Sequence, residues 1–197
     1  ISTPATPGFL CQAGLSLCGG RCVNTTVNTQ NCGSCGVTCT AAQSCKAGAC
    51  VGVNQIVLAR LSNVVPERFE LYNGGSTPVA LDTWSVEWVS DSSTDNFTIP
   101  ANTTLAPGAW LTLFEGTGFN TSSTLFMGRT ITWSTAIAVT LRNATVQGVD
   151  FVRTGNSSVN PIAPTTWSGV NAPNPSDTAD EVLQRSITSL DSNTAAD

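Results

Sequence analysis

Hydrophobic and polar residues alternate along much of the chain after Val53, as expected for β-strands with one buried face. In the segment 84–90, Trp84, Val86 and Trp88 alternate with Ser85, Glu87 and Val89, so the first three are predicted to point into a core. The other predicted strands cover residues 55–62, 68–75, 109–114 and 136–143. Of these, 109–114 is almost wholly apolar and is predicted to be buried on both faces.

Turn residues separate these strands at short intervals, for example Asn73-Gly74-Gly75 and Ala106-Pro107-Gly108. Many short strands with almost no helical pattern predict an all-β fold, a β-sandwich. A single helical turn is predicted within 177–187, and the Pro- and Asn-rich segment 160–176 is predicted to be a loop.

The cysteines divide the chain, because all eight lie within its first 50 residues. A segment this small buries too little apolar surface to fold without covalent or metal cross-links, whereas the longer remainder can build its own core. We therefore predict an extended arm over 1–10, a disulfide-rich module over 11–50 and a sandwich over 51–197. The cysteines are Cys11, Cys18, Cys22, Cys32, Cys35, Cys39, Cys45 and Cys50.

The pair Cys32 and Cys35 forms a C-x-x-C motif, which also occurs in zinc sites and in redox-active dithiols. Zinc sites usually have two separate C-x2-4-C pairs, whereas the irregular gaps here, 6, 3, 9, 2, 3, 5 and 4 residues, give no clean arrangement of two such pairs, and no βαβ pattern surrounds the motif. The even count and the short segment favour four disulfides and no metal site. The spacing does not specify their pairing.

Further features favour an extracellular or cell-surface location. Six Asn residues occupy N-x-S/T glycosylation motifs, which would lie on surface loops of a secreted protein. No basic segment followed by an apolar stretch opens the sequence, as expected if a secretory signal has been removed. The glycosylation candidates are Asn24, Asn96, Asn102, Asn120, Asn143 and Asn156.

Charge and hydropathy exclude two classes of partner. The net charge of −5 and the single Lys argue against binding to a nucleic acid backbone. No apolar run approaches the length of about 18 residues that a membrane span requires. The expected partners are copies of this chain, in an oligomer or filament, or another surface protein, and glycans are candidate ligands.

The sequence has no His, which excludes nucleophiles activated by an imidazole. Paired carboxylates could still hydrolyse glycosides, and the available pairs are Glu67 with Glu70, Asp91 with Asp95, and Glu70 with Glu87 if their strands are adjacent. Solvated charge is the simpler interpretation of these acids. We therefore expect no enzymatic activity.

No cofactor is expected. If there is one, calcium fits best, at Asp91 and Asp95 or at Asp177, Asp180 and Glu181. Of the Trp residues, Trp84 and Trp88 are predicted to lie in the core. Trp167 lies in the predicted loop and is the first candidate for ligand binding.

Two long motifs occur in order after the cysteines, and together they resemble the lamin tail domain, an immunoglobulin-like β-sandwich. The resemblance covers residues 55–197 and includes a closing segment that begins with Leu183, Gln184 and Arg185. Matching residues are Glu67, Glu70, Leu71, Tyr72, Asn73, Pro78, Val79, Leu81, Trp84, Phe97, Pro100, Thr104, Leu105, Pro107 and Gly108. Where the family often has an Asn-Glu pair, this chain has Ala59-Arg60.

Residues 18–50 resemble a second pattern, CGGxCVNT…NCGxCGxxC, found in secreted and cell-surface proteins of myxobacteria and of some eukaryotic microbes. Together the two resemblances imply a non-catalytic structural protein that acts through protein–protein contacts, as a rigid spacer or docking surface. The alternative is an extracellular module that binds carbohydrate or another surface ligand.

Overall fold

The computed structural model describes residues 10–39, 43–52, 56–90, 93–133, 135–175 and 182–185, to which all structural statements below refer. The chain forms two compact units, Ile1–Val53 and Asn54–Asp197. The described residues form strands and no helix, so the predicted all-β class is confirmed. None of them belongs to a helix long and apolar enough to cross a membrane.

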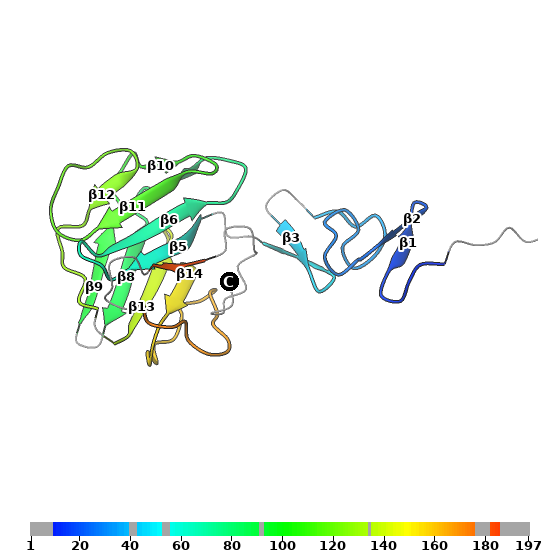
Figure 1. Cartoon of the computed structure of the whole chain (residues 1–197). Coiled ribbons are helices and arrows are strands. Elements are labelled where there is room, and N and C mark those ends of the chain that lie inside the picture. Colours follow the sequence, from blue (N-terminus) through cyan, green and yellow to red (C-terminus); the bar gives the residue numbers. More distant parts are fainter. Residues whose placement is uncertain are drawn as a thin grey trace, which may run out of the picture. The chain divides into compact units, whose positions relative to one another are not determined.

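The first unit contains two short hairpins (Figure 1). Strand β1 (Ser16–Cys18) pairs with β2 (Arg21–Val23), and β3 (Gln43–Lys46) pairs with β4 (Ala49–Gly52). The turn between β1 and β2 is Gly19-Gly20, and both glycines have a positive φ that other residues rarely adopt.

The second unit is a sandwich of two main sheets (Figure 1). The five-stranded sheet has the order β12 (Thr124–Phe126), β11 (Trp110–Phe114), β6 (Arg68–Asn73), β5 (Ile56–Ser62), β15 (Leu183–Gln184). The four-stranded sheet has the order β14 (Gly148–Arg153), β13 (Ile137–Arg142), β8 (Ser85–Ser90), β9 (Thr94–Thr98). A short pair joins β7 (Val79–Ala80) to β10 (Thr104–Leu105).

The core lies between the two main sheets and follows the predicted alternation. Val86 and Trp88 of β8 are fully buried, and Trp84 packs half-buried against the same cluster. The ring of Trp88 contacts Phe69 of β6, with centroids 5.6 Å apart, so these aromatic side chains connect the two sheets.

Strand β11 corrects the prediction that 109–114 is buried on both faces. Leu111 and Leu113 are buried, whereas the alternate residues Trp110, Thr112 and Phe114 are only half-buried. The second face of β11 lies on the outside of the sandwich, and apolar content alone did not distinguish an aromatic outer face from a core face.

Backbone groups at a β-bulge in β5 form hydrogen bonds with the opposite sheet and with the closing segment. The register between β5 and β6 shifts between Leu58 and Arg60, which leaves Ala59 as an extra residue. The N–H of Leu58 donates to Oδ2 of Asp150 in the opposite sheet, at 2.6 Å, and the N–H of Arg185 donates to the carbonyl of Ala59, at 2.9 Å. Backbone groups at the bulge are therefore satisfied from two distant parts of the chain.

Asp150 and Arg185 also form a buried ion pair. Nη2 of Arg185 lies 3.2 Å from Oδ1 of Asp150, and the two side chains are 6% and 0% exposed. The closing segment is thus extended where a helical turn was predicted within 177–187, because Leu183 and Gln184 pair with β5. The other residues of that prediction, 177–181 and 186–187, lie outside the described residues.

We expect Asp150→Asn to lower the free energy of unfolding by about 3–5 kcal/mol, because it removes the buried carboxylate that pairs with the Arg185 guanidinium. The matched control is Asp95→Asn, which removes a carboxylate from the exposed pair with Arg129 and should cost less than about 1 kcal/mol. Urea denaturation of both variants measures the difference. Equal losses would contradict the importance of the buried pair.

Residues 51–197 are expected to fold without the cysteine-rich unit, because the core cluster of the sandwich contains no cysteine. This fragment should unfold cooperatively on heating, with the same midpoint in the presence and absence of a reducing agent. Circular dichroism measures the transition. A fragment without a cooperative transition would show that the sandwich depends on the preceding unit.

Candidate functional site

The first unit is held by four disulfides that use all eight cysteines, so the predicted disulfide framework is confirmed. Cys32 and Cys35 belong to different disulfides, so the C-x-x-C motif is not a redox pair. The pairs are Cys11–Cys22, Cys18–Cys35, Cys32–Cys45 and Cys39–Cys50.

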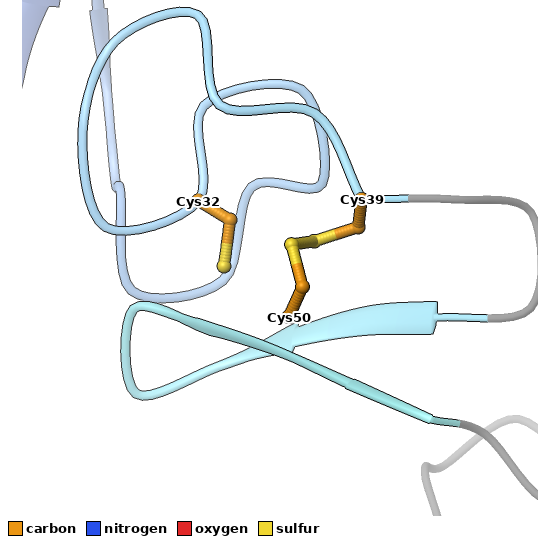
Figure 2. Close-up of side chains that lie close together, drawn as sticks. All are labelled: Cys32, Cys39 and Cys50. Carbon is orange, nitrogen blue, oxygen red and sulfur yellow. A yellow bond between two sulfur atoms is a disulfide. The ribbon is translucent and has the colours of Figure 1, made fainter.

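The sulfur atoms of Cys32, Cys39 and Cys50 lie within 4.8 Å of one another, a grouping that thiolates could use to bind a metal. Figure 2 shows the Cys39–Cys50 disulfide beside the side chain of Cys32, and Cys32 is itself bonded to Cys45. A metal ligand must be a thiolate, and a disulfide sulfur is not one. The grouping is therefore the centre of a small cystine core.

This cystine core requires a close approach of two glycines. Gly33 and Gly48 both have a positive φ, and a Cβ on Gly33 would overlap the carbonyl oxygen of Gly48. The N–H of Gly33 also donates to the carbonyl of Thr25, at 2.8 Å. The backbone thus packs directly on itself beside the cysteines, which explains why glycine occupies both positions.

Two of the candidate acids, Glu70 and Glu87, bind arginines. Glu70 accepts hydrogen bonds from Arg60 and Arg68, at 3.1 and 3.0 Å, and Glu87 pairs with Arg142. Glu70 and Glu87 could form a pair only on adjacent strands, and this condition is not met, because β6 and β8 belong to different sheets.

Two further candidate acids, Glu67 and Asp95, lie among the described residues. Glu67 is buried, and its N–H donates to Glu115 Oε1 at 2.9 Å. Asp95, a candidate for calcium binding and catalysis, accepts a hydrogen bond from the Arg129 guanidinium at 2.9 Å. The other calcium candidates, Asp91, Asp177, Asp180 and Glu181, lie outside the described residues.

Trp167, the first candidate for ligand binding, packs against the sandwich. Its ring meets Phe151 edge-on, with centroids 5.8 Å apart, and it lies half-buried against the core cluster. Its Nε1 is buried and has no hydrogen-bond partner among the described residues. The ring therefore has a packing role, and ligand binding by its exposed part stays a prediction.

The six glycosylation candidates differ in their surroundings. Asn24, Asn102, Asn120 and Asn156 are exposed outside the strands, whereas Asn96 is exposed within β9 and not on a loop. Asn143, in contrast, is half-buried. Its Oδ1 accepts hydrogen bonds from the N–H groups of Thr145 and Gln147 in the turn between β13 and β14. Asn143 is thus the least accessible acceptor.

Strand β9 forms an open sheet edge. It pairs with β8, and no backbone hydrogen bond from the described residues reaches its other side. Ser93 and Ile99, at its two ends, bond to the β8 side. Because bonding alternates in an antiparallel ladder, Thr94, Asn96 and Thr98 direct their N–H and C=O groups away from β8.

The other sheet edges are shorter or covered. At the opposite edge of the same sheet, the residues after β14 bridge to Ala172, and the N–H of Gly148 donates to Ala163. The edge strands of the larger sheet, β12 and β15, have three and two residues. Among the described residues, β9 is therefore the longest uncovered edge available for an added strand.

The outer face of the five-stranded sheet carries a group of aromatic and charged residues that the sequence did not reveal. Tyr72 and Trp110 stand opposite each other on β6 and β11, with ring centroids 4.9 Å apart. Phe114 and Phe126 form a second pair, stacked at 5.6 Å. The register places the row of Arg60, Glu70 and Thr112 between these two pairs.

The fold and the cystine framework define an immunoglobulin-like sandwich preceded by a small disulfide-rich module. Residues 46–156 match the Lamin Tail Domain, and because this is more than half of the chain, the chain belongs to that family. Residues 5–52 match the Stigma-specific STIG1-like protein family. No curated protein matches the chain.

Gly33→Ala is expected to disrupt oxidative folding of the first unit, because the added Cβ overlaps the carbonyl oxygen of Gly48. Gly36→Ala is the matched control, since Gly36 has a similar positive φ, 80° against 77°, but open space around its Cβ position. The control should lose only the backbone strain of about 1–2 kcal/mol and still form native disulfides. Peptide mapping after refolding measures the pairing, and equal mispairing in both variants would contradict the argument.

Proposed function

We propose that this chain is a non-catalytic secreted or cell-surface structural protein that acts through protein–protein contacts. Its partners are copies of itself, in an extracellular assembly or filament, or a neighbouring surface protein. The disulfide framework supports an extracellular location, because such bonds persist in oxidising compartments. The match to a STIG1-like module agrees with this location.

A non-catalytic role is supported by how the acidic side chains are used. The carboxylates of Glu70, Glu87 and Asp95 each bind at least one arginine. A general acid or nucleophile must instead face the substrate with a free carboxyl group. These three acids therefore stabilise the sandwich surface, and no cofactor enters the proposal.

The observation that carries the proposed contact is the open edge of β9. An unpaired edge strand presents N–H and C=O groups that another strand can complete, a common way for sandwiches to bind extended segments. The inward-facing charge of Asp95 is neutralised by Arg129, at 2.9 Å, so it does not repel an incoming strand. Residues 1–10 of another copy, for which the sequence predicts an extended arm, are the segment we assign to this edge.

Thr94→Pro tests the edge. It removes an N–H that points away from β8, so pairing between β8 and β9 should persist while assembly weakens at least tenfold in the protein concentration required. Thr94→Val keeps the N–H and should assemble like the original protein. Light scattering over a concentration series measures assembly, and electron microscopy identifies filaments.

Deletion of residues 1–10 tests the arm separately. The shortened chain should stay monomeric at concentrations where the intact chain assembles. Assembly that survives the deletion would contradict the role of the arm and leave the edge in place. An intact chain that stays monomeric at high concentration would contradict self-assembly altogether, leaving a different surface protein as the partner.

A further inference from the structure

The outer face of the five-stranded sheet presents two guanidinium groups on one shared carboxylate. Nη1 of Arg60 binds Oε2 of Glu70 at 3.1 Å, and Nε of Arg68 binds Oε1 of the same side chain at 3.0 Å. Two positive charges and one negative charge leave a surplus of one positive charge. On a chain with a net charge of −5, this local surplus is complementary to an anion.

The bulge at Ala59 places Arg60 on this face. Without the extra residue, Ala59 would stand opposite Glu70, and Arg60 would point into the core. With it, the Arg60 guanidinium lies 4.3 Å from the centroid of the Trp110 ring, and its Nε binds Gln184 at 2.9 Å. The arginine is therefore held in position before any ligand arrives.

Donor groups remain after these contacts. Both Nη groups of Arg68 and Nη2 of Arg60 have no hydrogen-bond partner among the described residues. The Arg60 and Arg68 side chains are 37% and 25% exposed, whereas that of Glu70 is 10% exposed. An anion thus reaches the guanidinium groups before the carboxylate between them.

The polar row lies between two aromatic rows. Positions two apart on a strand share a face and lie about 7 Å apart, so the Tyr72–Trp110 row and the Phe114–Phe126 row are separated by about 13 Å. All four rings are half-buried and lie outside the core cluster. The face therefore combines half-buried aromatic rings with two guanidinium groups, Arg60 in the polar row and Arg68 opposite Phe114.

We propose that this face binds an acidic polysaccharide built of uronate residues. The carboxylate of a uronate pairs with the guanidinium donors of Arg60 and Arg68, in the planar geometry that arginine favours. The neighbouring sugar rings lie against the two aromatic rows. This site is separate from the β9 edge, which belongs to the other sheet, and the proposal does not depend on self-assembly.

A polysaccharide fits this face better than an acidic peptide does. An extended peptide gains most from a sheet edge, where its backbone completes the hydrogen-bond ladder, and the middle of a sheet face offers no unpaired backbone groups. Flat rings on both sides of a charged strip instead suit a chain of ring-shaped units with a carboxylate on each.

Binding of polygalacturonate to the full chain tests the proposal, by isothermal titration calorimetry with a calcium chelator present. The fully methyl-esterified polymer has the same rings without the charge and should bind at least tenfold more weakly. Polyglutamate has the charge without the rings and should also bind at least tenfold more weakly. Added salt should weaken binding of polygalacturonate.

Arg68→Gln should weaken binding about tenfold, the order of one charge-assisted hydrogen bond. Arg21→Gln is the control, because it removes an equal charge from an exposed residue of the first unit, outside the sandwich, and should bind like the original chain. Phe114→Leu should weaken binding several-fold while leaving the charges intact. Thermal unfolding of each variant checks that the sandwich is folded.

Three results would overturn the proposal. The first is no binding of polygalacturonate by the folded chain, and the second is equal binding of the methyl ester. The third is equal binding of polyglutamate without any effect of Phe114→Leu, which would identify the face as a general docking surface for acidic proteins. Because none of these measurements depends on the oligomeric state, failure here is distinguishable from failure of the proposed self-assembly.

Discussion

The buried carboxylate of Asp150 joins the two main sheets of the sandwich and the closing segment. It comes from β14 in the four-stranded sheet, accepts the Leu58 N–H of the five-stranded sheet and pairs with Arg185 of the closing segment. Replacing water around a buried carboxylate is costly, so the charge is tolerated only where such partners are all in place. The position of one sheet over the other and the docking of the closing segment are thereby coupled, and the bulge that exposes Arg60 depends on both.

The two units of the chain reach stability by different physical routes. In the sandwich, buried side chains from both sheets supply the apolar area that offsets chain entropy. In the first unit, the buried cluster consists of cysteines, and their cross-links stabilise the fold by lowering the entropy of the unfolded chain. Conditions that reduce disulfides therefore act on one unit alone, and conditions that weaken hydrophobic burial act mainly on the other.

Much of the fold could be predicted from local pattern, whereas the candidate sites depended on distant pairing. Alternation identified Val86 and Trp88 as core residues because strand periodicity is a local property. It could not reveal which arginine meets Glu70, because Arg60 arrives from another strand and only through a bulge. The disulfide pairing was likewise undetermined by spacing. The prediction that 109–114 is buried on both faces was wrong because an outer face of aromatic residues and a buried face have a similar apolar composition.

The bulge in β5 also changes how this strand must be read position by position. Before Ala59, the odd-numbered Val57 faces outward and the even-numbered Leu58 faces the core; after it, Arg60 faces outward and Leu61 inward. The inward-facing residues are therefore even-numbered before the bulge and odd-numbered after it. A prediction that assumes strict alternation along the whole strand would assign its second half to the wrong face. The alternation changes at Ala59-Arg60, the two residues that differ from the Asn-Glu pair of the family resemblance.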